Sequence, residues 1–433
     1  MPVLVTMVAT VTAWLRLPAA ARDVVWAEDG RNFLQDALTN GPIPALAIPY
    51  SGYLHTVPRI IAGLTVSFVP VPLYAESMTF GACLAAGIAA AVVFVCTADV
   101  VPWLPARLAI GMLTVLAPLE PREVLGNAAN LHSLMLWMLF WILLYRPRGR
   151  IGAVLLGVAA FLGAVTEIQA VFLLLLIALR WRVREARAIR IALLVGIGLQ
   201  LLATLFDPRG HSAIPETSLP SVAYGYLINS VVPIWAQQHA VGPLVAAGGF
   251  WVCLLLFLPF VALLGFILWR GSRIQRVAAT SAAVLSIVVY AVSVWTTPEA
   301  RYEYASLSAT QLSQLSTLRY GVLPSMLILA LVPLGATVAL HRPAAGPRGR
   351  RAVRWALVAT LSGALLLSVV VHLAPQYTVR TNGPQWMPEA TAAESYCARA
   401  PDSSTVALAE TLDWRVNVPC WRLEPTPVSK AQP

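Results

Sequence analysis

The sequence predicts an all-α protein, a polytopic transmembrane helical bundle with about eleven spans. Hydrophobic residues make up 58% of the chain and charged residues only 12%, whereas soluble proteins carry about 25% charged residues. Apolar runs of roughly 20 residues recur from end to end, and each is long enough to cross a hydrocarbon core of roughly 30 Å. Because these runs are continuous rather than alternating, we expect helices, not the strands of a barrel.

Four clusters of arginine join consecutive apolar runs and set the expected topology. They are Arg146 to Arg150, Arg180 to Arg190, Arg270 to Arg276 and Arg342 to Arg354. Positive charge is retained on the cytoplasmic side of a membrane, and two runs separate adjacent clusters, so all four clusters should be cytoplasmic. The spans are then expected near 2–21, 74–97, 107–119, 131–145, 151–167, 169–180, 190–206, 242–269, 277–296, 320–340 and 352–373.

Two stretches after the first run are expected to be interfacial helices. Residues 27–39 place an apolar face opposite a polar one, which is typical of a helix lying on the membrane surface. Residues 54–70 are apolar, but a crossing there would invert every arginine cluster that follows. We therefore expect a transmembrane module at 1–373 and a small extracytoplasmic tail at 374–433.

The first apolar run, 2–21, allows a second interpretation. Arg16 interrupts it, and the stretch 17–22 (Leu-Pro-Ala-Ala-Ala-Arg) loosely resembles a small-residue cleavage site. A cleaved signal peptide is therefore the alternative. An anchored first helix agrees better with the topology that the arginine clusters require.

The net charge of +10 does not indicate nucleic-acid binding. The basic residues lie in short clusters between apolar runs, without a basic face that carries interleaved aromatic residues. The five cysteines include no CxxC pair and no Cys/His metal spacing, so no zinc site is expected. Cys397 and Cys420 lie in the tail, where a disulfide suits an exported location. The partners should be membrane lipids and no nucleic acid.

The acidic residues are concentrated on the expected outer, non-cytoplasmic side. Of the 20 Asp and Glu residues, only Asp99 and Glu185 fall clearly on the cytoplasmic side. Glu28 and Asp29 stand at the start of the first interfacial helix. Carboxylates there are either helix caps or a general base within reach of an acceptor hydroxyl. We expect the function on the extracytoplasmic face of the plasma membrane.

Five further polar residues of the outer segments are candidates for substrate binding. Tyr53 and His55 precede the second interfacial helix, although aromatic residues at an interface are also ordinary anchors. Asn130 and His132 open an apolar helix, where polar groups are costly unless they are used. Glu167, between two apolar runs, is either a turn residue or a cavity carboxylate.

Arg319 stands at the outer head of a span, where the positive-inside tendency disfavours arginine. A guanidinium binds phosphate through paired donors, so a lipid phosphate is its natural partner. The alternative is an arginine that snorkels to the interface. Arg301, Arg59 and Tyr320 are the further candidates for binding a donor phosphate.

These features together resemble the GT-C-fold glycosyltransferases, which are polytopic membrane enzymes that use polyprenyl-phosphate sugars. The resemblance rests on the acidic pair Glu28-Asp29 in the first outer loop, the interfacial helix at 54–70, and Arg319-Tyr320 with Pro324, which is similar to an Arg-Tyr-x-x-x-Pro element of several members. It covers the whole chain as architecture. The chain lacks the large outer domain of many members, and its Ala-, Val-, Arg- and Pro-rich composition looks actinobacterial.

The resemblance implies transfer of a sugar to an extracytoplasmic glycan or glycolipid acceptor with inversion, in cell-wall assembly. Asp29, or else Glu28, matches the catalytic base of the family, and Arg319 matches its phosphate-binding arginine. The donor would be polyprenyl-phosphate mannose or arabinose, so the enzyme would be a mannosyltransferase or an arabinosyltransferase. No cofactor is required, and a divalent metal near Glu28, Asp29 and Glu123 is compatible with this chemistry.

Two other functions compete with glycosyl transfer. A lipid or sugar transporter or flippase would place ionisable residues inside the spans, and Gln200 is the nearest approach to this pattern. A polymer ligase or a non-catalytic assembly subunit would need a larger basic outer loop than any expected here.

Overall fold

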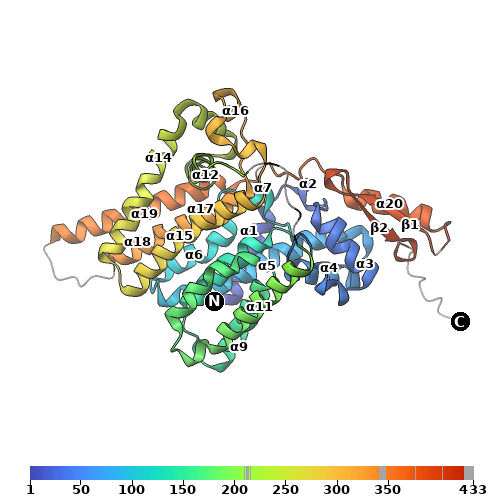
Figure 1. Ribbon diagram of the computed structural model, residues 1–433, viewed down its shortest axis with the longest axis horizontal. Coiled ribbons are helices and arrows are strands. Elements are labelled where there is room, and N and C mark those ends of the chain that lie inside the picture. Colours follow the sequence, from blue (N-terminus) through green and yellow to red (C-terminus); the bar gives the residue numbers. More distant parts are fainter. Residues whose placement is uncertain are drawn as a thin grey trace.

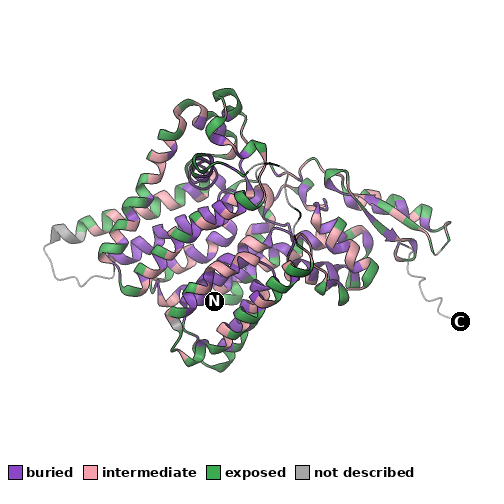
Figure 2. Cartoon of the chain, viewed as in Figure 1, coloured by how far each residue is buried: buried purple, intermediate pink, exposed green. Residues whose placement is uncertain are grey.

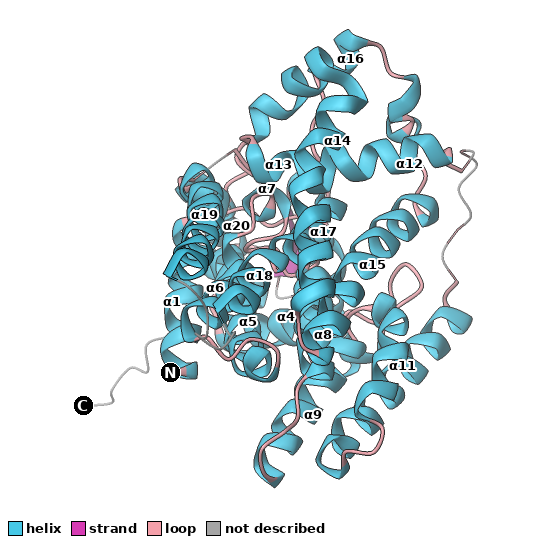
Figure 3. Cartoon of the chain, turned by 90° about the vertical axis from the view of Figure 1, so that its left-hand side faces the viewer, coloured by secondary structure: helices cyan, strands magenta, loops and turns pink. Residues whose placement is uncertain are grey.

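The computed structural model describes residues 1–208, 210, 214, 216–340, 348–375, 377–401 and 403–423. Within these residues the chain is an all-α bundle that carries a two-stranded antiparallel sheet in its tail (Figure 1). Helices, cyan in Figure 3, make up nearly all of its regular structure. The long helices are α1 (Pro2–Leu15), α5 (Tyr74–Cys96), α6 (Leu104–Leu116), α8 (Leu131–Leu144), α9 (Arg150–Ala164), α11 (Arg187–Phe206), α14 (Gln238–Arg270), α15 (Arg273–Thr296), α17 (Val322–Leu329), α18 (Leu331–Leu340) and α19 (Arg348–Leu373).

Shorter elements fill the connections. In chain order they are α2 (Ala19–Arg22), a π-helix (Asp29–Leu34), α3 (Gln35–Asn40), α4 (Thr56–Phe68), α7 (Glu120–Glu123), α10 (Leu174–Ile177), α12 (Leu219–Tyr226), a second π-helix (Leu227–Val231), α13 (Val232–Trp235) and α16 (Ala309–Ser313). The tail contains α20 (Trp386–Cys397), β1 (Thr405–Ala409) and β2 (Arg415–Pro419). Both stretches expected to be interfacial, 27–39 and 54–70, are helical.

Six helices in the described part of the chain are long and apolar enough to cross a membrane, by length and composition. They are Val71–Asp99, Arg184–Phe206, Gln238–Arg270, Arg273–Thr296, Arg319–Leu340 and Ala352–Leu373. The structure therefore has the helical character of a multi-pass membrane protein, but it does not establish eleven spans. At five of the expected positions the regular helix is shorter than the roughly 20 residues of a full crossing. Those positions are 2–21, 107–119, 131–145, 151–167 and 169–180.

Burial separates a central helix from peripheral ones. The most apolar window of Arg319–Leu340 is 100% buried, whereas the corresponding windows of α14 and α19 are 22% and 17% buried. Much of these two peripheral helices is coloured exposed or intermediate in Figure 2. Their exposed large apolar side chains include Trp251 and Leu366. Exposed apolar helix faces are expected where the surrounding solvent is lipid. Arg319 thus heads a helix that the rest of the bundle encloses.

Arg16 follows directly after α1, two residues before Pro18. The guanidinium is buried and donates to the carbonyl oxygens of Val115 at 2.5 Å and His372 at 3.0 Å. It also pairs with the buried carboxylate of Glu120 at 3.4 Å. A buried charge persists where it is paired and hydrogen-bonded. Arg16 therefore ties the end of α1 to the segment after α6 and to α19.

Contacts between connections gather three of the arginine clusters at one end of the bundle. Arg146 pairs with Glu185 at 3.8 Å, and Arg148 pairs with Asp99 at 3.5 Å. The side chain of Gln275, in the third cluster, donates to the backbone carbonyl of Val100, the residue after Asp99, at 3.1 Å. This shared end is the arrangement that the expected topology requires. Part of the fourth cluster lies outside the described residues.

The tail packs against the first connecting loop, at the right of Figure 1. Trp386 is fully buried; its indole Nε1 donates to the carbonyl of Val71 at 2.8 Å, and its backbone N–H donates to that of Asp23 at 2.8 Å. Arg422 donates to the carbonyl of Val66 at 2.8 Å. Several separate contacts therefore hold the tail in one position on the bundle.

Cys397 and Cys420 form a disulfide that joins α20 to the end of the β-hairpin, closing a sequence separation of 23 residues. A loop of this length contributes about 3 kcal/mol to stability in the chain-entropy account. Replacing both cysteines by serine should therefore make the tail more susceptible to limited trypsin digestion. Wild-type protein treated with a reductant should match the double variant. Equal digestion rates for oxidised wild type and variant would contradict this prediction.

Candidate functional site

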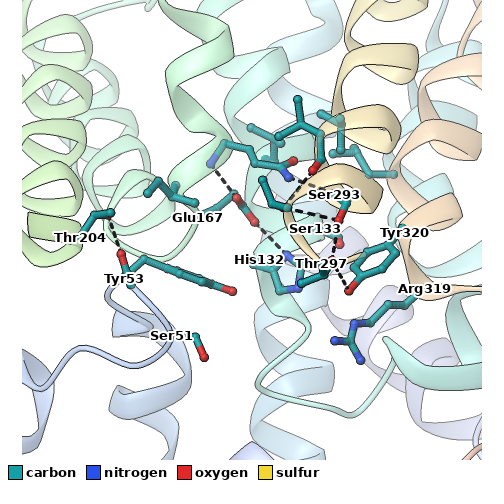
Figure 4. A pocket seen from close by; sticks show the side chains of 18 residues that line it. Ser51, Tyr53, His132, Ser133, Glu167, Thr204, Ser293, Thr297, Arg319 and Tyr320 are labelled. Atoms are coloured by element: carbon teal, nitrogen blue, oxygen red, sulfur yellow. Dashed lines mark hydrogen bonds and ion pairs between the residues drawn. The ribbon is translucent and has the colours of Figure 1, made fainter. Parts of the chain in front are cut away.

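A cavity of about 280 Å³ opens beside the head of the central helix (Figure 4). Its walls come from α8, α11, α15, the turn that contains Glu167, and a loop after the first helices. Five residues predicted from the sequence line it: Tyr53, His132, Glu167, Arg319 and Tyr320. They come from segments far apart in the sequence, so the fold brings together most of the predicted binding residues.

His132 and Glu167 form a pair inside this cavity. Nδ1 of His132 lies 2.8 Å from Oε2 of Glu167, while Oε1 of Glu167 accepts from the backbone N–H of Gln169 at 2.7 Å. The side-chain amide of Gln169 donates through Nε2 to the hydroxyl of Ser293 at 3.0 Å. Because Nδ1 is engaged, Nε2 is the ring nitrogen left to bind a ligand. The pair and its neighbours can hydrogen-bond the hydroxyls of a small polar substrate.

Arg319 faces the same cavity from the central helix. Its guanidinium pairs with Glu123 and lies 5.4 Å from the ring centre of Tyr320, and the side chain is 34% exposed. Tyr320 shares a hydrogen bond with Thr297 at 3.1 Å. A guanidinium has five N–H donors, so one carboxylate leaves others for a second anion. Arg319 is therefore equipped to bind a phosphate at the cavity.

The backbone around Arg319 is held closely. The N–H of Leu318 donates to Oδ1 of Asn229 at 2.7 Å. A Cβ on Gly321 would stand only 2.0 Å from the backbone carbonyl oxygen of Asn229. Only glycine permits this approach, which fixes the turn from which the Arg319 side chain reaches the cavity.

Asp29 is placed differently from the prediction of an accessible base. The side chain is 2% exposed, and its two oxygens accept from the backbone N–H groups of Ala128 at 2.9 Å and Ala129 at 2.7 Å. Burial raises the pKa of Asp29 to about 7, against the opposing effects of these hydrogen bonds and of Arg380. Asp29 does not line the cavity; it joins the first loop to the segment that leads into α8.

Glu28 is the more accessible member of the acidic pair. It is partly exposed, and the described residues offer its carboxylate no hydrogen bond. It lies within electrostatic range of both Arg319 and Glu410, which belongs to the tail. Glu28 is therefore a partly exposed carboxylate near both the head of the central helix and the tail.

Four other predicted residues do not line the cavity. They are Arg59, Arg301, His55 and Asn130. Arg59 is buried and pairs with Asp36 at 2.8 Å, while Arg301 is largely exposed and pairs with Glu299 at 2.6 Å. Both guanidiniums already have a carboxylate partner away from the cavity.

His55 and Asn130 support the cavity from outside. The His55 ring is 4% exposed and packs against Tyr53, with 4.1 Å between ring centres. The Asn130 amide donates to the backbone carbonyl of Glu123 at 3.0 Å. His55 thus backs a residue of the cavity wall, and Asn130 holds the turn that carries the partner of Arg319.

The described residues contain no group of three or more His, Cys, Asp and Glu side chains arranged to hold a metal ion. Asp29 and Glu123, two of the three carboxylates considered for a metal, are occupied by backbone N–H groups and by Arg319. Sequence reasoning missed Ser293 and Thr297, which line the cavity. Their signal was available, because two hydroxyls four residues apart at the end of an apolar helix share one face.

No protein-family model, curated protein or solved structure matches this chain. Its function is therefore inferred from its own residues and their geometry.

The junction between the tail and the first loop should weaken as the pH rises. Burial raises the pKa of Glu410 to about 8, and the neighbouring Asp29 and Glu28 add to this rise. When folding raises the pKa of a carboxyl group, the resulting contribution to stability is fully present at a pH below the ordinary carboxyl pKa of about 4. This contribution is lost as the pH rises through the pKa of the folded state. The Glu410→Gln variant, in contrast, stays neutral at every pH.

Thermal unfolding of wild type and Glu410→Gln between pH 5 and pH 8.5 measures this effect. The two melting temperatures should be close at pH 5, and the wild type should melt below the variant at pH 8.5. A difference that does not change with pH would contradict the assignment of this pKa shift to Glu410.

Proposed function

We propose that this protein is an integral-membrane glycosyltransferase that moves a sugar from a polyprenyl-phosphate donor to an extracytoplasmic glycan or lipid acceptor with inversion. The observation that carries the proposal is the cavity that Arg319 shares with the His132–Glu167 pair. It offers, in one space, a guanidinium that can bind phosphate and groups that can bind sugar hydroxyls, and Glu28 lies within electrostatic range of Arg319. A sugar phosphate needs this combination of partners.

The donor would bind with its phosphate on Arg319 and its sugar in the cavity. Apolar side chains such as Val289, Val292 and Leu323 form part of the wall, so the bound phosphate and guanidinium would be partly shielded from water. Electrostatic interactions strengthen in such surroundings. The polyprenyl chain would extend into the lipid alongside the peripheral helices.

Glu28 is the catalytic base of this proposal. The hydroxyl oxygen of the acceptor forms a bond to the anomeric carbon as the bond from that carbon to the phosphate oxygen breaks. The proton of the hydroxyl passes to the Glu28 carboxylate, and the polyprenyl phosphate leaves with its negative charge held by Arg319. A single displacement inverts the anomeric centre. Asp29, which the family resemblance favours as the base, is here a positioning residue.

The proposal includes the membrane topology expected from the sequence. About eleven spans, with 54–70 lying in the interface, put the arginine clusters in the cytoplasm and the cavity on the extracytoplasmic face. The domain division at 373 and the actinobacterial character of the chain remain predictions from the sequence. Mannose and arabinose are the first donor sugars to test.

The transporter alternative receives no support from Gln200. This side chain is 1% exposed, and it accepts from the backbone N–H of Leu54 at 2.8 Å and donates to the carbonyl of the same residue at 3.2 Å. Gln200 therefore anchors the loop before α4. It fulfils a structural role that requires no transport pathway.

The experiment is a transfer assay with the purified full chain in lipid nanodiscs. Radiolabelled polyprenyl-phosphate mannose, arabinose and glucose would be offered with a set of glycan and glycolipid acceptors. We expect a covalent product from one donor, with its anomeric configuration inverted in NMR spectra. Movement of a labelled lipid across proteoliposomes, without covalent transfer from any donor, would instead identify a flippase.

A further inference from the structure

A second cavity, of about 430 Å³, lies between the tail and the first loop. Its wall combines two tryptophans with polar and charged side chains: Trp26, Trp414, Asn382, Glu410, Asp413 and Arg415. Trp26 belongs to the first loop, and the others belong to the tail. This cavity shares no lining residue with the cavity at Arg319.

The turn between β1 and β2, which lines this cavity, has a strained backbone. Leu412 and Asp413 are consecutive residues with φ of +63° and +59°. Non-glycine residues enter the left-handed region at an energetic cost and persist there when surrounding contacts hold them. Thr411 supplies such a contact, because its hydroxyl accepts from the backbone N–H of Ala27 at 2.8 Å. The first loop thus holds the turn that carries Asp413 and Trp414.

Glu410 reaches the wall of this cavity as a buried carboxylate. The residue is 2% exposed, and neither oxygen makes a hydrogen bond of normal geometry among the described residues. A Cβ on Gly30 would meet Oε2 of Glu410 at 1.8 Å, so the carboxylate lies directly against the first turn of the π-helix. A buried polar group without a good partner is costly. Glu410 therefore joins the wall of the cavity to the first loop.

The cavity lies next to the proposed catalytic base. Trp26 lines this cavity, and Glu28 follows it two residues later in the first loop. Glu28 also lies within electrostatic range of Glu410, in the wall of this cavity, and of Arg319, in the wall of the first cavity. A base near both cavities can accept the proton of a hydroxyl bound in one cavity as the oxygen of that hydroxyl attacks a sugar bound in the other.

We propose that the cavity of the tail binds a neutral saccharide, the acceptor of the proposed transfer. Tryptophan offers a flat apolar face together with an N–H donor, and the Asn382 amide and the exposed Asp413 carboxylate can accept hydrogen bonds from sugar hydroxyls. The charge of Asp413 disfavours a phosphate or another anion here, in contrast to that of Arg319. The role of this saccharide as an acceptor rests on the proposed function. Its binding can be measured independently of transfer.

The test is saturation-transfer NMR on the full chain in lipid nanodiscs, which avoids the sugar headgroups of maltoside detergents. The probes are neutral hexasaccharides of mannose, arabinose, galactose and glucose. At least one should bind, and Trp414→Ala and Asn382→Ala should each weaken its affinity at least tenfold. Asn382 is exposed at the rim, so its variant keeps the test valid if Trp414→Ala fails to fold.

Two controls separate this cavity from other parts of the chain. Trp421→Ala removes a tail tryptophan that is 56% exposed and outside the cavity, and Arg319→Ala alters the first cavity; both should bind the same hexasaccharide within twofold of wild type. Absence of binding by every probe, or binding unchanged in Asn382→Ala and Trp414→Ala, would overturn the proposal. Binding through this cavity without transfer from any donor would leave the saccharide site standing and overturn the proposed function.

Discussion

Glu28→Gln should lower the rate of sugar transfer by about 10²- to 10⁴-fold, the range that a positioned general base contributes. The amide has nearly the shape of the carboxylate but cannot accept the proton of the acceptor hydroxyl. Donor affinity should stay within about twofold, because Arg319 and the cavity groups are unchanged. The measurement is kcat for transfer together with a direct binding curve for the polyprenyl-phosphate sugar.

Asp29→Asn is the matched control for this prediction. The asparagine oxygen can keep one of the two backbone hydrogen bonds from Ala128 and Ala129, so transfer should fall less than in Glu28→Gln, and the thermal stability should fall with it. If Asp29→Asn abolished transfer at unchanged stability while Glu28→Gln kept it, the base would be Asp29 and the assignment made here would be wrong.

Arg319→Ala should lower kcat/KM for transfer by about 10²- to 10³-fold, the loss seen when one donor to a developing anion is removed. The guanidinium would contact the phosphate both in the bound donor and as it leaves, so both KM and kcat should worsen. Arg319→Lys should recover only part of the loss, because an ammonium group cannot bind phosphate through two parallel donors.

Arg301→Ala is the matched control for Arg319→Ala. Arg301 is a mostly exposed arginine of the preceding loop, already paired with Glu299, and its loss should change kcat/KM less than threefold. Equal effects of the two substitutions would indicate a general role of positive charge at the surface. Such a result would contradict a specific role of Arg319 in phosphate binding.

The sequence predicted the helical membrane character because lipid imposes one simple pattern on every span. It did not predict helix lengths well. α1 ends at Leu15, three residues before Pro18, and Arg16 makes a buried pair with Glu120, a residue 104 positions further along the chain. The expected span 169–180 is instead a 3₁₀ turn, Ile168–Leu173, followed by the short helix α10. Hydropathy reveals neither such endings nor distant partners such as Glu120.

The candidate site was predictable where a polar residue stands out against an apolar background. His132, Glu167 and Arg319 carry that signal, and all three line one cavity. Arg59 carries the same signal but is held by Asp36, because a buried arginine recruits whichever carboxylate the fold brings near. The choice between a cavity residue and a structural pair depends on three-dimensional neighbours.

The tail gave the least information in the sequence. Its residues have the composition of an ordinary polar segment, and no pattern marks Glu410 or Trp414. Their importance comes from docking: Arg31 lies 4.5 Å from the ring centre of Trp414, and Gln35 accepts from the backbone N–H of Asn417 at 2.7 Å. A short tail thus completes the first loop, and only a folded structure shows this.

The most direct measurement of the central claim is a structure of the full chain in nanodiscs with a non-cleavable polyprenyl phosphonate sugar bound. We predict that the phosphonate contacts the guanidinium of Arg319 at about 3 Å, the distance of a charge-assisted hydrogen bond. The sugar should lie beside His132 and Glu167, with Glu28 on the side of the anomeric carbon opposite the phosphonate. A phosphonate bound away from Arg319, with this cavity empty, would contradict the account.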